Sequence, residues 1–379
     1  MRVLVAPASF KESLSAAEAA RAMAEGVRRA GAEAVELPLA DGGRGTAECL
    51  AGPLGLQMRS VAVAGPLGEP VTAAFGINVE TGTAVLEMAS ASGLALVPPQ
   101  RRDVMRATTR GSGELVRAAL EAGARHVIIG VGDSATADGG CGAAQALGVR
   151  LLDAGGRAIG PGAGALANLA RVDVSGRYAP VAETEFRVAC DVDNPLLGPR
   201  GAARVFAPQK GASPAQVETI EANLAHLADV IEHDLGVDVR AVTGGGAAGG
   251  LGAGAVAFFG ASLEPGAEWI LRAVHAEEHV AHADLVLTGE GRLDAQSLGG
   301  KAPMVLARLA RAAGAPCVVI PGSVGPGHEA ALAEGASAVF PLVGGDVTLS
   351  DALARPAALL ARRAEESVRR FAAGNLSTG

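Results

Sequence analysis

Acidic, basic and amide side chains gather in a short glycine-rich segment at residues 288–297, directly after an apolar run. Its polar members stand at alternate positions and are Glu290, Arg292, Asp294 and Gln296. This density is typical of a ligand-binding loop at the carboxyl end of a strand, and the alternative is a solvated loop of salt bridges. Lys301 follows at the expected start of the next helix, where a cation is unfavourable for the helix dipole. We therefore expect Lys301 to reach a phosphate of the ligand.

A second segment, residues 130–140, combines small and hydroxylated residues at the point where a helix should begin. Ser134 and Thr136 offer hydroxyl donors, and Asp138 and Gly139 follow them. Hydroxyls and bare backbone N–H groups at a helix N-terminus suit phosphate oxygens. The alternative is a tight structural turn, but the hydroxyls and the acid favour a functional loop.

An Asp-Gly-Gly element occurs twice, once at Asp138 and once as Asp41, Gly42 and Gly43. Both copies follow an apolar run and precede a helix. Such a turn can cradle an anion on its N–H groups and offer a carboxylate to a metal ion. The alternative is an aspartate that caps a helix beside glycines that only ease the turn.

Two further segments have a weaker signal. Lys11 lies in a loop after the first strand, just before a helix whose capping box is Ser15 and Glu18, and a solvated lysine is its alternative. Asp191 and Asn194 belong to a segment with two carboxylates and an amide, which are ligands for hard cations. An Asx turn before Pro195 explains that segment equally well.

Two familiar motifs are better explained as structure. Gly244, Gly246 and Gly249 match a dinucleotide fingerprint, but the residues before them make a poor strand. His275 and His279 match a zinc-protease variant, H-x-x-E-H, yet they belong to the expected wet face of a helix. We expect neither nicotinamide chemistry nor a zinc centre.

The elements that position these segments alternate as in a doubly wound α/β fold. At the N-terminal end we expect strands at residues 2–6 and 35–39 and helices at 15–30 and 45–51. At the C-terminal end we expect strands at 285–287, 317–320 and 338–342 and helices at 302–313, 330–334 and 351–371. Between them, residues 61–63, 71–75 and 84–88 indicate antiparallel hairpins. We therefore predict a parallel-sheet domain from both chain ends, residues 1–64 and 266–379, and an inserted domain at 65–265.

Composition excludes several classes of function. Hydrophobic residues make up 49% of the 379 residues, which is enough for folded cores. The net charge of −8 and the lack of a basic cluster exclude a nucleic-acid footprint. The one long charge-free stretch, residues 241–263, is too glycine-rich for a membrane helix, and four scattered cysteines indicate a reduced, cytoplasmic protein.

Nine segments, taken together and in order, resemble the bacterial glycerate kinases of the type I family. They are S-F-K-E-S at 9–13, A-D-G-G at 40–43, G-P-L-G at 65–68, S-A-T at 134–136, D-G-G at 138–140, D-V-D-N-P-L at 191–196, P-Q-K-G-A at 208–212, G-E-G-R-L-D at 289–294 and G-K-A-P at 300–303. The resemblance implies a flavodoxin-like domain with an inserted α/β domain. It also implies transfer of the ATP γ-phosphoryl group to a hydroxyl of D-glycerate, usually giving 2-phosphoglycerate.

With that resemblance we expect a kinase that uses ATP and Mg²⁺, with small-molecule substrates and no nucleic-acid or membrane partner; a homodimer stays open. Phosphoryl transfer asks mainly for positioning and charge neutralisation. Lys11 and either Lys301 or Arg292 would neutralise charge. Asp191 or Asp294 would orient or deprotonate the acceptor hydroxyl, and Asp41 or Asp138 would hold Mg²⁺.

Five positions depart from the family's usual motifs. They are Ala8 for Asp, Arg44 for Glu, Arg110 for an aromatic residue, Asp133 for Gly and Ala137 for Asn. These changes suit a more anionic or differently shaped acceptor. The alternative function is a catalytically silent relative that binds a small anionic metabolite.

Overall fold

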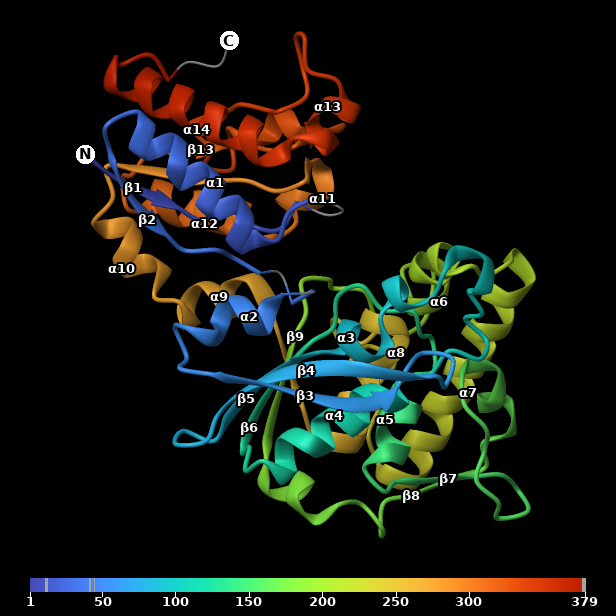
Figure 1. Cartoon of the computed structure of the whole chain (residues 1–379). Helices are drawn as coiled ribbons and strands as arrows, with labels where there is room; N and C mark the ends of the chain where they lie inside the picture. The colour runs from blue at the N-terminus through green and yellow to red at the C-terminus, as the bar shows by residue number, and fades with distance from the viewer. Residues whose placement is uncertain (11–12, 41, 44, 377–379) are drawn as a thin grey trace. The chain divides into compact units, whose positions relative to one another are not determined.

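The first apolar run of the chain forms strand β1 (Arg2–Val5), which lies inside a five-stranded parallel sheet, one strand from its edge (Figure 1). Its neighbours are β2 (Glu33–Glu36) on one side and β11 (Leu285–Thr288) on the other, and β13 (Cys317–Val319) and β15 (Ala338–Val339) follow β11. Val3 is aligned with Ala34 and with Leu285 in the two registers. Segments from both ends of the chain therefore share one sheet, in the order β15-β13-β11-β1-β2.

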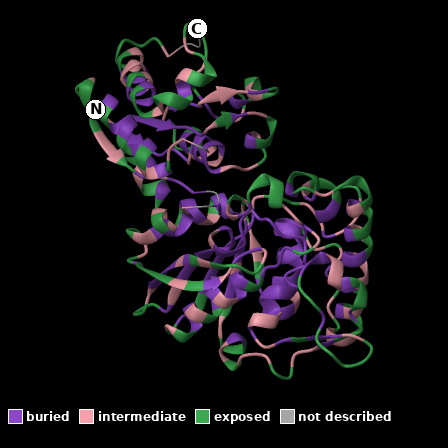
Figure 2. Ribbon diagram, turned by 45° about the vertical axis from the view of Figure 1, so that its right-hand side comes forward, coloured by how far each residue is buried: buried purple, intermediate pink, exposed green. Residues whose placement is uncertain are grey.

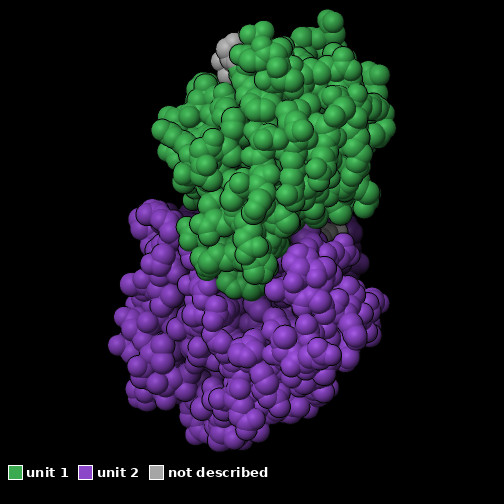
Figure 3. Space-filling view, turned by 90° about the vertical axis from the view of Figure 1, so that its left-hand side faces the viewer, with its two compact units in different colours: residues 1–41, 267–379 green, residues 42–266 purple. Residues whose placement is uncertain are grey.

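The computed structural model describes residues 1–10, 13–40, 42–43 and 45–376. Two compact units are present, coloured separately in Figure 3: residues 1–41 with 267–379, and residues 42–266. We call them the first and the second unit.

Helices of the first unit begin where the sequence offers caps. Helix α1 (Ala16–Arg29) starts at the Ser15–Glu18 capping box and packs against α14 (Pro356–Ala372). The other helices are α9 (Gly266–Ala273), α10 (Ala276–Ala281), α11 (Ala295–Leu298), α12 (Ala302–Ala312) and α13 (Leu349–Ala354). The expected helix at 351–371 is in fact α13 and α14, because Pro356 starts a new helix after Arg355 leaves the helical conformation. The expected helix at 330–334 is a short 3₁₀ turn, η6 (His328–Ala331).

The second unit contains a mixed six-stranded sheet in the order β10-β9-β6-β5-β4-β3. Its strands are β3 (Gln57–Ala64), β4 (Pro70–Asn78), β5 (Thr83–Glu87), β6 (His126–Gly130), β9 (Glu185–Ala189) and β10 (Ser262–Glu264). The expected hairpins are present, because β3–β4 and β4–β5 are antiparallel. The pairs β5–β6, β6–β9 and β9–β10 are parallel, so their carboxyl ends meet at one edge.

The predicted boundary after residue 64 was wrong. Strand β3 pairs with β4 along its whole length, from Gln57 opposite Ile77 to Ala64 opposite Pro70. The preceding helix α2 (Thr46–Ala51) also belongs here, since the carboxylate of Glu87 accepts from the backbone N–H of Ala47 at 2.8 Å. Residues 42–64 therefore lie in the second unit rather than with the chain ends.

The remaining helices of the second unit are α3 (Met88–Ser92), α4 (Arg110–Glu121), α5 (Cys141–Ala146), α6 (Ala202–Phe206), α7 (Pro214–Leu235) and α8 (Ala247–Phe259). Single 3₁₀ turns occur at η1 (Leu94–Leu96), η2 (Pro99–Arg101), η3 (Ala163–Asn168), η4 (Ala179–Glu183) and η5 (Pro208–Lys210), and β7 (Arg150–Leu152) pairs with β8 (Arg171–Asp173). Helix α8 is kinked at its start, where Ala248 has a φ of 52° and two glycines with positive φ follow. This kink contacts the loop after β6, as described below.

Each sheet has its own apolar core (Figure 2). Val3, Leu287 and Val318 are fully enclosed in the first unit, and Ile77 and Val188 in the second. In the described part of the chain, none of the helices has the length and apolar character that a membrane span needs. The polar segments singled out in the sequence thus lie at the ends of strands whose bodies are buried.

Candidate active site

The turn at Gly42 and Gly43 lies across the carboxyl edge of the second unit's sheet. The N–H of Gly132 donates to the Gly42 carbonyl at 3.2 Å. A Cβ on Gly130 would stand 2.3 Å from the same oxygen, so only glycine permits this approach. The turn therefore contacts the loop after β6, as expected for one binding edge; Asp41 itself lies outside the described residues.

Ser134 and Thr136 of that loop contact a buried lysine. The Nζ of Lys210 donates to the Ser134 hydroxyl at 2.8 Å and to the Thr136 carbonyl at 2.6 Å. Only 2% of Lys210 is exposed, and burial lowers the pKa of its amine to about 7, although the negative charge of Asp138 opposes the change. A cation thus lies directly behind the two hydroxyl-bearing residues of the loop.

Backbone strain is concentrated beside this contact. Asp133 has a φ of 57° and Ala248 a φ of 52°, values that non-glycine residues seldom adopt. The Thr136 hydroxyl donates to the Ala248 carbonyl at 3.4 Å, and a Cβ on Gly249 would collide with the Thr136 carbonyl at 2.0 Å. Strain of this kind persists where the surrounding structure fixes a loop tightly.

Asp138 is enclosed and saturated with hydrogen bonds. Its Oδ2 accepts from the N–H and the hydroxyl of Thr109 at 2.8 and 3.0 Å, from the Thr108 hydroxyl at 3.2 Å and from the Gly142 N–H at 3.2 Å. Its Oδ1 accepts from the Gly140 N–H at 3.3 Å. Burial raises the pKa of this carboxyl above its ordinary value, and these donors oppose the rise. Asp138 therefore joins the first turns of α4 and α5, and its oxygens already have partners.

The polar residues of the loop after β9 differ in their surroundings. Asp193 is exposed and pairs with Arg200 at 2.5 Å, and that hydrogen bond holds the pKa of Asp193 below its usual value. The Asn194 amide donates to the Arg200 carbonyl at 2.7 Å. Asp193 and Asn194 thus stabilise the loop itself, whereas Asp191 is half-buried and closer to the end of the strand.

In the first unit, the loop after β11 places Glu290 and Lys301 together. Glu290 is 5% exposed, and one of its oxygens lies 3.1 Å from the Lys301 Nζ. The same amine lies 3.5 Å from the buried Ser297 hydroxyl. The N–H of Ala8, just past β1, donates to the Gly289 carbonyl at 2.8 Å. The residues after β1 thus begin beside this loop, although Lys11 is outside the described residues.

Asp294 has a structural partner on each oxygen. Its Oδ1 caps α11 by accepting from the Gln296 N–H at 3.0 Å, and its Oδ2 lies 3.5 Å from the Arg292 Nε. The guanidinium of Arg292 and the side chain of Gln296 are exposed. Of the four residues at alternate positions, Glu290 is therefore buried, and Arg292, Asp294 and Gln296 are at least partly exposed.

The departures from the usual motifs have individual explanations. Ala8 and Ala137 are buried, and Asp133 occupies the left-handed backbone position where the family usually has glycine. Arg110 is exposed at the start of α4 and pairs with Glu114 at 2.9 Å. Arg44 lies outside the described residues. None of the four described changes introduces an unpaired buried charge.

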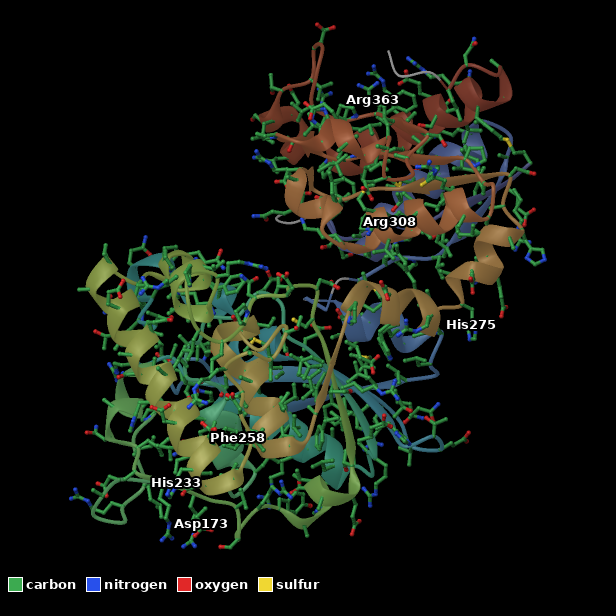
Figure 4. All side chains as sticks on the ribbon, turned by 180° about the vertical axis from the view of Figure 1, so that it is seen from behind. Asp173, His233, Phe258, His275, Arg308 and Arg363 are labelled. Atoms are coloured by element: carbon green, nitrogen blue, oxygen red, sulfur yellow. The ribbon has the colours of Figure 1, made fainter. Side chains whose placement is uncertain are left out.

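Neither familiar motif has the context that its chemistry requires. Gly244 to Gly249 lead from a turn into the kinked start of α8, and residues 236–246 contain no strand. His275, labelled in Figure 4, lies at the break between α9 and α10 with a φ of 51°, so it does not share a continuous helix with His279. Across residues 1–10, 13–40, 42–43 and 45–376, no three His, Cys, Asp or Glu side chains converge as a metal site.

Lys210 was missed as a candidate site residue, although it stands in the P-Q-K-G-A segment. A signal was available: the chain has three lysines, Lys11, Lys210 and Lys301, against 29 arginines. The other two were already site candidates. Thr108 and Thr109 were missed as well, because nothing local shows that they meet Asp138 about 30 residues away.

One unit with a parallel sheet and one with a mixed sheet, both with polar loops after parallel strands, define an α/β protein of the kind that binds ligands at strand ends. The family model of the glycerate kinase family matches residues 3–372. A glycerate kinase from Bacillus subtilis (strain 168) is 48% identical over 97% of this chain and 96% of its own, and a glycerate 2-kinase from Escherichia coli (strain K12) is 47% identical over 93% of each. A crystal structure provisionally named glycerate kinase 2, from Salmonella typhimurium LT2, has a TM-score of 0.85 and 44% identity over 99% of both chains. The chain belongs to the glycerate kinase family, and it is a kinase.

Proposed function

We propose that this protein transfers the γ-phosphoryl group of ATP to the 2-hydroxyl of D-glycerate, giving 2-phosphoglycerate and ADP. The name of the Escherichia coli relative supports the 2-position. The observation that carries the proposal is the Lys210 contact, in which a buried amine donates to the Ser134 hydroxyl and the Thr136 carbonyl on a glycine-rich strand-to-helix turn. Such a turn suits phosphate or carboxylate oxygens.

The charges of both substrates require cations and donors. In the first unit, Lys11, Arg292 and Lys301 would neutralise phosphate or carboxylate charge, with Glu290 holding Lys301 in place at 3.1 Å. In the second unit, Gly42, Gly43 and Ser134 would supply N–H and O–H donors. The expected donors Thr136 and Gly139 already donate within the protein, the Thr136 hydroxyl to the Ala248 carbonyl at 3.4 Å and the Gly139 N–H to the Gly249 carbonyl at 3.1 Å. Asn194 in the second unit and Gln296 in the first would each offer a further polar side chain to a ligand.

One carboxylate must hold the acceptor hydroxyl and take its proton, and Asp191 and Asp294 are the two candidates. Asp294 caps helix α11, and the neighbouring side chains of Arg292 and Gln296 are exposed. Asp191 follows β9 directly and is half-buried. Either group, placed within hydrogen-bond reach of the hydroxyl, would act as a general base.

When bound, Mg²⁺ neutralises charge on the transferring phosphates. The donors suited to it are carboxylates with an open oxygen. Asp138 does not fit, since four donors surround its Oδ2 and one its Oδ1. Asp41 remains the proposed ligand at the Asp-Gly-Gly turn, and Asp191 is the acid of the neighbouring loop that suits a hard cation.

The direct test is ADP formation from ATP with D-glycerate, with L-glycerate and no acceptor as controls. We expect turnover that requires D-glycerate and Mg²⁺. A rise in melting temperature with D-glycerate but without turnover would instead indicate the binding-only alternative. Light scattering would test the open possibility of a homodimer, and fractionation of the native cells would test the expected cytoplasmic location.

A further inference from the structure

Lys210 is held in one orientation by its local structure. It ends the 3₁₀ turn η5, which Pro208 begins and Gly211, with a φ of 95°, terminates. The Lys210 N–H donates to the Ala207 carbonyl at 3.0 Å, and the Gly211 N–H to Pro208 at 3.0 Å. Proline and a left-handed glycine leave this short turn little freedom. The backbone therefore fixes where the Lys210 side chain starts, and the hydrogen bonds to Ser134 and Thr136 fix its amine at the loop after β6.

The amine has a defined effect on Ser134. In its protonated form the Lys210 ammonium donates hydrogen bonds and cannot accept one, so in that form the contact at 2.8 Å makes the Ser134 oxygen the acceptor. The hydroxyl proton of Ser134 must then point to another acceptor. Because Ser134 is the part of the contact that retains 9% exposure, that acceptor can be an oxygen of a bound anion.

The surroundings of the Lys210 amine have opposite effects on its pKa. Asp138 raises its pKa through its charge, while burial lowers it. Arg102 lies on the other side of the turn, where its Nη1 donates to the Gln209 carbonyl at 3.3 Å. Arg204 of α6 is engaged with Glu218 at 2.6 Å, and Asp133 is exposed.

The use of lysine in this chain gives an independent observation. Arginine supplies 29 of the 32 basic residues, and Lys210 is one of three lysines in the sequence. Lysine and arginine differ because the ammonium is compact and can lose its proton, whereas the guanidinium is planar and remains charged. A buried lysine among so many arginines indicates a position that requires the compact amine.

We propose that Lys210 is a positioning residue of the kinase reaction: it fixes the Ser134 hydroxyl as a donor to an anionic oxygen of a substrate. This inference rests on the proposed function, because it takes Ser134 as part of the substrate site. Lys210 itself contacts protein atoms and acts through Ser134.

The test is a double-mutant cycle of Lys210→Met, Ser134→Ala and the double variant, with KM for D-glycerate and for ATP and kcat measured for each. We expect each single variant to raise the KM of one substrate by about 10- to 100-fold, the effect of losing a hydrogen bond to a charged group. If Lys210 acts through Ser134, the double variant should match Lys210→Met within about twofold, since coupled effects do not add. Multiplied effects, or an unchanged KM for both substrates, would overturn the proposal.

A matched control separates positioning from folding. Ile220→Val changes the buried face of α7 in the same unit and should lower stability modestly without changing either KM. If Lys210→Met does not fold, Lys210→Gln takes its place in the cycle. A kcat that falls with the folded fraction, at constant KM, would reduce Lys210 to a structural residue.

A second readout does not need turnover. With three lysines in the chain, the side-chain NMR signals of isotope-labelled lysine can be assigned by the loss of one signal in Lys210→Gln. The Lys210 amine should titrate near pH 7, and D-glycerate or inorganic phosphate should shift its pKa upward as a negative charge approaches. A Lys210 titration that neither D-glycerate nor inorganic phosphate changes would contradict the inference, even if the wild type proved inactive with glycerate.

Discussion

The Nζ of Lys301 lies 3.1 Å from a carboxylate oxygen of Glu290, a residue that is almost wholly buried after β11. The lysine is one-third exposed, so one side of its ammonium faces Glu290 and another remains accessible. A cation held in this way is fixed in position before a ligand binds, which lowers the cost of ordering it on binding.

Substitutions of Lys301 should separate the contribution of this pair to stability from its contribution to catalysis. Removing the cation leaves the buried carboxylate with one partner fewer, so we expect unfolding free energy to fall by about 1 to 3 kcal/mol. Lys301→Arg preserves the charge and should recover most of the stability, but its planar group should not restore kcat/KM. Chemical denaturation and steady-state kinetics measure both quantities. Full activity in Lys301→Arg would show that only charge is needed there.

Asp294→Asn tests the general base in the first unit. Asparagine caps helices as well as aspartate, so the melting temperature should change little, whereas kcat should fall about 100-fold or more if Asp294 takes the proton. Asp294→Ala serves as a control for the cap and should cost about 1 kcal/mol of stability. A kcat within about threefold of wild type would remove Asp294 from the catalytic residues and leave Asp191.

Asp138→Asn should destabilise the protein without changing its need for Mg²⁺. The amide cannot satisfy all five donors that now surround the carboxylate, so we expect a loss of about 1 to 3 kcal/mol. The exposed Asp229→Asn, which loses only a surface pair with Arg240, should stay within about 0.5 kcal/mol of wild type. A rise of about tenfold or more in the Mg²⁺ concentration for half-maximal activity would return Asp138 to the list of metal ligands.

Stability should depend on pH through Lys210. Its amine has a pKa of about 7 in the folded protein and the ordinary value of 10.5 when exposed, so the unfolded chain binds more protons between these values. The unfolding free energy contributed by this residue must therefore rise as pH increases from 7 to 10.5. The difference between wild type and Lys210→Met, measured by denaturation at each pH, removes the contributions of other groups. If the difference in unfolding free energy between wild type and Lys210→Met did not change with pH, the lowered pKa of the buried Lys210 amine would be contradicted.

His279→Ala should leave kcat and metal content unchanged. The helix that would pair it with His275 is broken at His275 itself, and His275 contacts Glu278 at 3.6 Å on the surface. Activity should survive the substitution within about twofold, as for other surface changes. Stoichiometric zinc that disappears together with activity in this variant would overturn the kinase mechanism.

The sequence predicted those elements whose formation depends on residues close together in the chain. The predictions of the Ser15–Glu18 capping box and of strands at β1, β11 and β13 were correct, because helix caps and buried strands have characteristic residues next to one another in the sequence. The place of residues 42–64 was not predictable in this way, since it depends on which strand β3 pairs with. Lys210 was missed for the same reason, because its contact with Thr136 joins residues that are 74 positions apart in the sequence.

The most direct measurement is ³¹P NMR of ATP and D-glycerate incubated with the wild-type enzyme and Mg²⁺. We predict that the γ-phosphate resonance of ATP disappears and that one phosphomonoester resonance, matching added 2-phosphoglycerate, grows with equal intensity as ADP forms. Growth of the 3-phosphoglycerate resonance would overturn the proposed position of transfer. An unchanged ATP spectrum, from protein that still unfolds cooperatively, would contradict glycerate as the acceptor.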